Sequence, residues 1–369
     1  MTSCAPDPAS DGAASVTRPD SSRLSELLRD DSTDQFPKAV EPREFHYPRD
    51  HGAHEEFRNE WWYFTGNLDT ELGRRFGYEL TLFRFSLTPE VPVPVNSDWQ
   101  TNQVYVGHFA VTDVQGEAFL FAQRYSRGSV GLAGATESPL RIWLDDWSVE
   151  TAGAGEQWRL AASDNRFAIS LSLTAAKPIV LQGERGLSQK SAEPGNASYY
   201  YSIPRLDTVG TLRLGEREFD VSGQSWLDRE WGSSALSRDQ RGWDWFALQL
   251  SDGSDLMFYT IRKNDGQPDE HSAGMFIGVD GQTTSLSYND VNIEVLDTWS
   301  SAGGGTYPAK WRMNIPARNL QIEVVPVLDN QELITNVRYW EGAVDVTGRA
   351  GMQQISGRGY VELTGYADP

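Results

Sequence analysis

Apolar and polar residues alternate along most of this chain, in short runs that begin near residue 60. An alternation with a period of two places successive side chains on opposite faces of a β-strand. Helical periodicity is nearly absent, and 34 glycines and 18 prolines punctuate the chain. We therefore predict an all-β fold of consecutive antiparallel strands. The clearest runs occupy residues 61–68, 78–85, 104–111, 118–123, 140–144 and 167–173.

The order of sequence features in the first half of the chain returns in the second half. The offset between matching residues falls from 183 at Trp62 and Trp245, through 153 at Trp158 and Trp311, to 134 further on. Different loop lengths explain this drift, so we predict two β-domains related by an internal repeat. The matching stretches are residues 62–69 with 245–252, 158–171 with 311–324, and 222–228 with 356–362, which pairs Trp226 with Tyr360.

The repeat divides the chain into three parts. Residues 1–44 are rich in Ser, Asp, Pro and Ala, and we predict a disordered tether. Residues 45–236 and 237–369 form the two repeats, and each is predicted to be a lipocalin-like antiparallel barrel. A closed barrel of roughly eight strands has room for one small ligand. Alternatively, side chains fill the barrel and a ligand site lies between the two domains.

Composition narrows the set of partners and environments. The formal net charge is −20, which argues against nucleic acid and anionic membrane surfaces as partners. No run approaches the roughly 20 apolar residues that a spanning helix needs. The chain carries 13 Trp, 14 Tyr and 15 Phe, and aromatic residues suit both β-structure and apolar binding sites.

The chain has one cysteine, Cys4, which excludes an internal disulfide. The residues around Cys4 also predict where in the cell the protein is located. Thr2-Ser3-Cys4 matches the end of a bacterial lipoprotein cleavage box, and a polar tail of small residues follows it. We expect a precursor with a signal peptide upstream and a lipid on Cys4. The protein is thus predicted to be a periplasmic or cell-envelope lipoprotein.

The candidate chemistry centres on residues 223–232, which read GQSWLDREWG. Alternation along a strand places Trp226, Asp228 and Glu230 on one face and the intervening residues on the other. A carboxyl group among aromatic side chains tends to have a raised pKa and can serve as an acid. The alternative is a buried ion pair that closes the end of a barrel.

Histidines supply a second set of candidates. His108 lies within the apolar run 104–111, where it is either a catalytic group or a core histidine bonded to a carboxylate such as Glu60. His51 and His54 have a spacing that suits zinc, but a zinc site needs three or four ligands and few others are near. We therefore predict no metal site.

Motif searches exclude several enzyme classes. The chain has no phosphate loop, no dinucleotide fingerprint and no Gly-x-Ser-x-Gly elbow, so we predict no cofactor and no serine hydrolase activity. Residues 199–201 are three tyrosines, which we interpret as half-buried strand. Residues 182–197 form a polar, glycine-bracketed stretch that we interpret as a mobile lid over a barrel mouth.

Several of these motifs together resemble the AttH/CrtC-type lipocalin-like family, which includes carotenoid 1,2-hydratases. The resemblance covers about residues 45–366 and implies two lipocalin-like barrels with apolar ligands. It also implies three kinds of function: hydration of a carotenoid double bond, pericyclic catalysis, or an envelope role associated with an ABC transporter. The motifs that carry it are EWWYFTGNL at 60–68, HFA at 108–110, WLDREWG at 226–232, WDW at 243–245 and GYVELTGY at 359–366.

The chain departs from the hydratase pattern around Asp228. The hydratases have a His-Asp-His-Asn-Trp-Gly-like run, and Leu227 and Arg229 stand here in place of the two histidines. Two functions remain. The first, which we favour on the sequence, is a cell-envelope carrier that binds an apolar, lipid-like or isoprenoid-like molecule. The second is a cofactor-free hydratase or isomerase acting on an unsaturated apolar substrate.

Both functions use one set of candidate residues. An enzyme would use Asp228, Glu230 and His108 as its catalytic groups. Tryptophan ring faces next to these carboxyls would stabilise a developing cation. The predicted ligand-binding residues are Glu60, Trp62, Trp226, Arg229, Trp231, Trp243, Trp245 and Tyr259.

Overall fold

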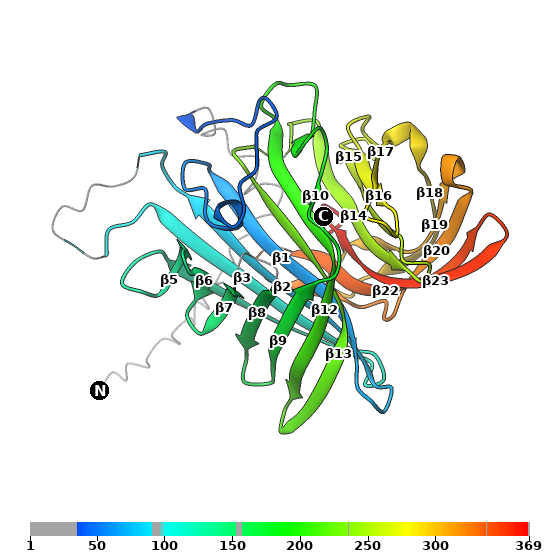
Figure 1. Ribbon diagram of the computed structural model, residues 1–369, viewed down its shortest axis with the longest axis horizontal. Helices are drawn as coiled ribbons and strands as arrows, with labels where there is room; N and C mark the ends of the chain where they lie inside the picture. Colours follow the sequence, from blue (N-terminus) through cyan, green and yellow to red (C-terminus); the bar gives the residue numbers. More distant parts are fainter. Residues whose placement is uncertain are drawn as a thin grey trace, which may run out of the picture.

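A computed structural model describes residues 35–90, 97, 99–152, 157–234, 236–336 and 338–367. Within these residues the chain forms two antiparallel sheets of 13 and 10 strands, which lie side by side (Figure 1). Short 3-10 turns occur at Arg49–His51, Tyr288–Asp290 and Pro316–Arg318. The predicted all-β fold is confirmed: the first sheet is a nearly closed barrel and the second a half-barrel.

The first sheet follows the order β4-β3-β2-β1-β13-β12-β9-β8-β7-β6-β5, with β10 and β11 paired to β12. Its strands are β1 (Asn59–Asp69), β2 (Arg75–Ser86), β3 (Gln103–Asp113), β4 (Ala118–Arg127), β5 (Ala133–Glu137), β6 (Leu140–Leu144), β7 (Trp147–Ala152), β8 (Gln157–Ser163), β9 (Phe167–Ala175), β10 (Val180–Leu181), β11 (Leu187–Gln189), β12 (Ala197–Leu214) and β13 (Arg217–Gly232).

The second sheet follows the order β17-β16-β15-β14-β23-β22-β20-β19-β18, with β21 paired to β22. Its strands are β14 (Gln240–Leu250), β15 (Asp255–Lys263), β16 (Ala273–Ile277), β17 (Thr283–Ser287), β18 (Asn292–Ser300), β19 (Thr306–Ile315), β20 (Leu320–Pro326), β21 (Glu332–Ile334), β22 (Arg338–Ala350) and β23 (Gln353–Leu363).

The two strand orders correspond, which confirms the internal repeat. Trp158 on β8 and Trp311 on β19 occupy equivalent strands, and so do Trp226 on β13 and Tyr360 on β23. The match of Trp62 with Trp245 is wrong by one residue. Across the equivalent strand pairs, Tyr63 faces Asp228 and Trp245 faces Glu362.

The corrected register also explains the two cores. Phe64 meets the ring of Trp158 at 5.5 Å, and Phe246 meets Trp311 at the same distance. Phe64 is therefore the equivalent of Phe246, and Tyr63 is the equivalent of Trp245. Both domains bury an aromatic pair at the same place, where alternation turns the first-strand ring inward.

Buried side chains fill the interior of the first barrel. Aromatic and aliphatic residues from β1 to β9, β12 and β13 form one buried cluster, and Trp62, Trp147 and Trp158 are fully buried in it. Gly107 on β3 allows Trp147 to pack closely against that strand, because a Cβ there would lie 2.9 Å from the ring of Trp147. Of the two predicted placements of a ligand site, the filled barrel favours the one between the domains.

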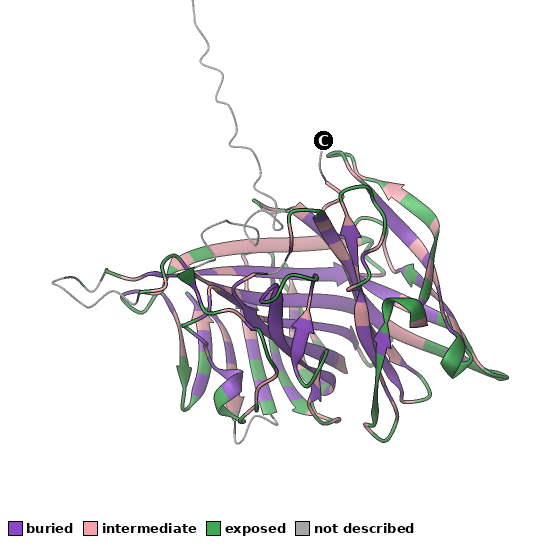
Figure 2. Cartoon of the chain, turned by 90° about the horizontal axis from the view of Figure 1, so that it is seen from above, coloured by how far each residue is buried: buried purple, intermediate pink, exposed green. Residues whose placement is uncertain are grey.

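The outer faces of β1 and β13 pack against the second domain. A separate buried cluster joins Tyr63, Tyr200 and Trp226 to Trp245 and Tyr259. Figure 2 shows that buried residues concentrate on the strands in the middle of the molecule, whereas exposed residues gather at loops and outer edges. The two domains therefore share an apolar interface, and this interface contains the candidate site.

The segment that precedes β1 packs on the first domain. Phe36 and Ala39 are buried, and Tyr199 donates a hydrogen bond to the carbonyl of Glu41. Residues 35–44, which we included in the predicted tether, are thus part of the packed structure. In the described part of the chain, helices of membrane-spanning length and apolarity do not occur.

Candidate functional site

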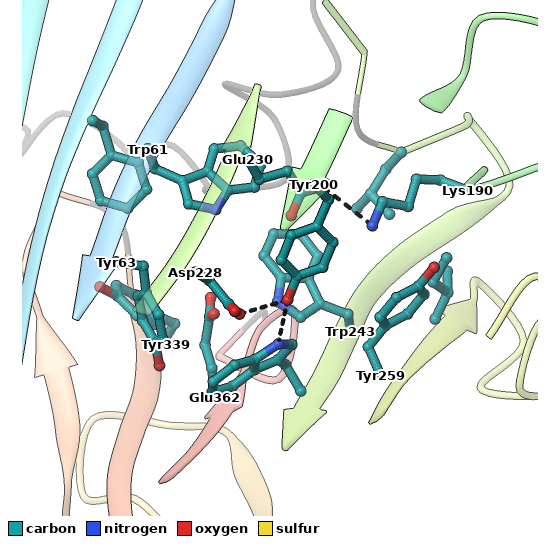
Figure 3. Close-up of a pocket in the computed structure, with 14 residues that line it drawn as sticks. Trp61, Tyr63, Lys190, Tyr200, Asp228, Glu230, Trp243, Tyr259, Tyr339 and Glu362 are labelled. Atoms are coloured by element: carbon teal, nitrogen blue, oxygen red, sulfur yellow. Dashed lines mark hydrogen bonds and ion pairs between the residues drawn. The ribbon is translucent and has the colours of Figure 1, made fainter. Parts of the chain in front are cut away.

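A cavity of about 80 Å³ lies between the two domains. Its volume admits several water molecules but not a long hydrocarbon chain. The first domain contributes residues from β1, β2, β12 and β13, and the second contributes residues from β14, β15, β22 and β23 (Figure 3). The lining residues are Trp61, Tyr63, Phe83, Lys190, Tyr200, Asp228, Glu230, Leu236, Trp243, Trp245, Tyr259, Ile261, Tyr339 and Glu362.

Asp228 is the carboxyl group at the centre of one wall. Its Oδ1 accepts hydrogen bonds from Ser202 Oγ at 2.5 Å and Trp226 Nε1 at 2.7 Å, and its Oδ2 accepts one from the Tyr200 hydroxyl at 2.5 Å. Trp245 Nε1 in turn donates to the Tyr200 hydroxyl at 3.1 Å. The carboxyl is therefore held in one orientation by donors from β12 and β13.

Burial raises the pKa of Asp228 to about 7, although the bonds from Ser202, Tyr200 and Trp226 lower it. The charge of nearby Glu230 adds to the increase. No cation forms an ion pair with Asp228 among the described residues. The group can therefore exchange a proton near neutral pH, as a general acid or base must.

Glu230 lies two residues further along β13 and has a cationic partner. Lys190 Nζ is 3.2 Å from Glu230 Oε1, and Ser198 also donates a hydrogen bond to that oxygen. Lys190 Nζ lies 4.3 Å from the centre of the Tyr259 ring. Burial alone would lower the pKa of Lys190, but Glu230 and Tyr259 raise it above its ordinary value. Lys190 is thus a charged ammonium that neutralises Glu230.

Glu362 is the second carboxyl of the cavity that lacks a cationic partner among the described residues. It occupies the position on β23 that Asp228 occupies on β13. Burial, together with the charges of Glu79, Glu230 and Asp228, raises the pKa of Glu362 to about 8, although a hydrogen bond from Trp243 lowers it. The repeat therefore brings two equivalent carboxyls, both with raised pKa values, to one cavity.

Four of the predicted site residues lie elsewhere, on the opposite face of the same strands. Glu60 accepts hydrogen bonds from both Arg84 and Arg229, and the Arg229 guanidinium lies 4.1 Å from the Trp62 ring and 5.1 Å from the Trp231 ring. Burial alone would raise the pKa of Glu60, but the two arginines hold it well below its ordinary value. On this face the alternative interpretation, a buried ion cluster at the barrel end, is the one observed.

His108 lies behind the cavity wall rather than in it. Its Nδ1 is 2.6 Å from the Tyr339 hydroxyl and its Nε2 is 2.7 Å from Gln123 Nε2. The expected bond to a carboxylate such as Glu60 does not form. Burial lowers the pKa of His108 to about 3, so the ring is neutral at physiological pH.

The remaining candidate residues lie in different places. Trp243, Trp245 and Tyr259 line the cavity, and Trp226 adjoins it through its bond to Asp228. His51 bonds to Tyr201 at 2.5 Å, whereas His54 bonds to Asp50 and Glu60. Across the described residues, three metal-ligating side chains do not meet at one point.

Sequence reasoning missed several lining residues. Tyr200 was interpreted as half-buried strand, and Lys190 belongs to the stretch 182–197 that was predicted to cover a barrel mouth. That stretch instead supplies a cation to the cavity between the domains. The match of Asp228 with Glu362 in the repeat was a signal that could have identified Glu362.

Comparison with known proteins agrees with the family resemblance of the sequence motifs. The family model described as AttH-like matches residues 38–366. The crystal structure of a putative AttH protein from Nitrosomonas europaea shares 34% identity and a TM-score of 0.81, over 90% of this chain and 100% of that one. No curated protein matches the sequence.

Two more distant structures share the fold. Kievitone hydratase from Nectria haematococca is 15% identical with a TM-score of 0.67, and the match covers 90% of this chain and 98% of that one. CghA is 12% identical with a TM-score of 0.53, over 93% and 97% of the two chains. At these identities the likeness concerns the fold alone.

Proposed function

This chain belongs to the AttH-like family, as its motifs predicted, and we propose that it is a cofactor-independent acid–base enzyme. Its substrate is an apolar, unsaturated molecule whose reacting end enters the cavity between the domains. The reaction is the addition of water to a carbon–carbon double bond or the reverse elimination.

One observation carries this proposal: the carboxyl of Asp228 is buried in an aromatic cavity, and none of the cationic side chains that the structure describes is paired with it. Burying such a group costs free energy, because burial disfavours its charged form. A carrier for apolar molecules gains nothing from that cost, whereas an acid catalyst needs a proton donor with a pKa near neutrality. The geometry therefore favours an enzyme over the carrier that the sequence favoured.

The residues suggest a sequence of proton transfers. Protonated Asp228 gives its proton to one alkene carbon, and the adjacent carbon becomes cationic beside the ring faces of Trp243 and Trp245. A water molecule adds to that carbon and loses a proton, which restores the acid form of Asp228. Glu362, which accepts a hydrogen bond from the indole N–H of Trp243 and whose pKa is raised to about 8, is a second carboxyl of the cavity that can carry a proton near neutral pH.

The departure from the hydratase pattern does not weaken this assignment. Leu227 and Arg229, which replace the two histidines, point into the first barrel and away from the cavity. Leu227 belongs to the barrel core, and Arg229 belongs to the ion cluster with Glu60. The two substitutions therefore change the packing on one face of β13. On the cavity face Asp228 is kept, and Glu230 stands where the hydratases have Asn.

The size of the cavity limits the substrate. A volume of about 80 Å³ accommodates a small molecule or one end of a longer one. Trp61, Phe83 and Trp243 are only partly buried and form the rim, so an apolar remainder of the ligand would lie against them. We propose a substrate with a compact reactive end, rather than a carotenoid enclosed along its whole length.

The test uses oxygen-18 water. Purified protein is incubated in that water with an organic extract of the source organism, and products are analysed by mass spectrometry. We expect a wild-type-dependent product that carries one labelled oxygen. Asp228→Asn should lower its rate by about 10²–10⁴, as removal of a general acid does. Asp220→Asn, an exposed change on the same strand, is the control.

The competing function, a carrier, predicts a different result. A carrier would return its ligand unlabelled and unchanged from both the wild-type protein and Asp228→Asn. Recovery of such a bound molecule, without any labelled product, would exclude the enzyme.

For its setting in the cell, we propose a lipoprotein of the cell envelope, anchored at Cys4 and associated with components of an ABC transporter. The motif around Cys4 supports the anchor, and the family resemblance supports the transporter. Cys4 lies outside the described residues. The anchored form would be exposed to apolar molecules that partition into the membrane.

A further inference from the structure

His108 is connected to the cavity through a single hydroxyl group. The residue is buried on β3, and its Nδ1 lies 2.6 Å from the hydroxyl of Tyr339, which lines the cavity. Its ring also meets Phe83, another lining residue, edge to face at 5.3 Å. The state of His108 can therefore affect a ligand only through the orientation of these side chains.

The amide of Gln123 fixes which nitrogen of His108 carries the proton. Gln123 Oε1 accepts hydrogen bonds from the backbone N–H of Asn336 at 3.3 Å and the hydroxyl of Tyr125 at 2.5 Å. A backbone N–H can only donate, so the amide oxygen faces Asn336 and the amide nitrogen faces His108. Gln123 Nε2 then donates to His108 Nε2 at 2.7 Å.

The proton of His108 must accordingly be on Nδ1. A neutral imidazole has one donor and one acceptor nitrogen, and Nε2 is used as the acceptor. Nδ1–H therefore donates to the oxygen of Tyr339, and the proton of the Tyr339 hydroxyl takes no part in that bond. Among the described residues, no hydrogen bond uses this proton.

We propose that Tyr339 donates its hydroxyl proton to an oxygen atom of the bound ligand, and that His108 is the positioning residue that directs it. The proposal rests on the proposed function, because it takes the cavity as the substrate site. It adds a substrate class: an apolar unsaturated compound with a carbonyl oxygen next to the reacting carbons. A donor at that oxygen polarises the conjugated double bond and stabilises the negative charge that develops on the oxygen as water adds to the far carbon. For this substrate class that route takes the place of the cationic one: Asp228 gives its proton to the carbon next to the carbonyl and takes up the proton that the water loses.

The first experiment measures the tautomer directly. The protein has five histidines, and nitrogen-15 labelling of this residue type gives separate signals for the two ring nitrogens. The signals of His108 are assigned by their loss in His108→Asn. We expect the Nδ1–H form, without titration between pH 5 and pH 9. The Nε2–H form in the wild-type protein would overturn the proposal.

A variant outside the cavity then reverses the tautomer. In Gln123→Glu, the carboxylate can only accept, so His108 should carry its proton on Nε2. Nδ1 becomes an acceptor and takes the Tyr339 proton away from the ligand. Gln123→Leu removes the amide without imposing either tautomer and is the matched control. If His108 had only a structural role, Gln123→Glu and Gln123→Leu would affect the ligand bond in the same way.

The second experiment follows the ligand bond with 1-indanone as the probe and indane as its counterpart without oxygen. We expect the carbonyl infrared band of bound 1-indanone to shift to lower frequency in the wild-type protein. Tyr339→Phe and Gln123→Glu should abolish that shift. They should also weaken 1-indanone binding about fivefold, the usual worth of one neutral hydrogen bond, while indane binding is unchanged.

The outcomes separate this inference from the proposed function. An identical carbonyl band in the wild-type protein and Tyr339→Phe overturns the inference, even where labelled product still forms with Asp228 present. A missing labelled product overturns the proposed function instead. If Tyr339→Phe fails to fold, Gln123→Glu gives the same test from outside the cavity.

Discussion

Replacing Asp228 by asparagine should make the stability of the protein less dependent on pH. The pKa of this carboxyl rises from its ordinary value of 3.8 to about 7 on folding. A group whose pKa is raised in the folded state is protonated more fully there than in the unfolded chain. Its contribution therefore favours the folded state at low pH and is lost as the pH rises from about 4 towards 7.

The size of this effect follows from the shift. A difference of about three pH units at 1.36 kcal/mol per unit corresponds to about 4 kcal/mol, as an order of magnitude. The uncharged amide in the Asp228→Asn variant would have no such dependence. Its oxygen can still accept bonds from Ser202 and Trp226, and its nitrogen can donate to the hydroxyl of Tyr200.

The assay is denaturant unfolding at a series of pH values, followed by tryptophan fluorescence. Relative to wild-type, the free energy of unfolding of Asp228→Asn should increase by up to about 4 kcal/mol between pH 4 and pH 8. Asp220→Asn, on the exposed part of the same strand, should track wild-type across the range. If Asp228→Asn also tracks wild-type, Asp228 is not an uncompensated buried acid, and the reasoning for its catalytic role is refuted.

Three further predictions concern separate parts of the molecule. Glu60→Gln leaves two buried arginines without their carboxylate and should cost about 3–5 kcal/mol in denaturant unfolding, whereas the exposed change Glu56→Gln should cost almost nothing. Lys190→Met and Glu230→Gln should each lower the free energy of unfolding, because each leaves one charge buried and unpaired, and the double variant should recover part of that loss. Strictly additive losses would show that the two residues are not coupled. When cells that express the natural precursor are fed radioactive palmitate, the protein should become labelled, and Cys4→Ser should remove the label. An unlabelled protein in the cytosol would refute the predicted anchor.

Much of the architecture could be predicted from the sequence, because alternation and repetition are local patterns. The division of β13 into two faces was predicted correctly, with Asp228 on one and Arg229 on the other. The register of the repeat was not, because aromatic residues follow one another directly both at Trp61-Trp62-Tyr63 and at Trp245-Phe246. Only the pairing of strands decides which ring faces the core.

The site was predictable only where a single strand carries it. Asp228 and Glu230 were identified because their neighbours in the sequence are also their neighbours in space. Lys190 and Tyr339 reach the cavity from a loop and from the other domain, and no local pattern reveals such contacts. Glu60 was misplaced for a related reason: a charged residue before an apolar strand does not show which side of the sheet it faces.

The two-sided construction of β13 has a consequence for how this family can change. On one side, Arg229 and its partners hold the barrel together; on the other, Asp228 and Glu230 meet the cavity. A point substitution on the cavity side can alter the reaction without disturbing the ion cluster on the barrel side, so the chemistry can change while that cluster is retained. A single-residue deletion within β13 has the opposite effect, because it exchanges the two sides and places the arginine in the cavity. Descendants of this scaffold should therefore differ by replacements along the strand, and insertions should be confined to its ends.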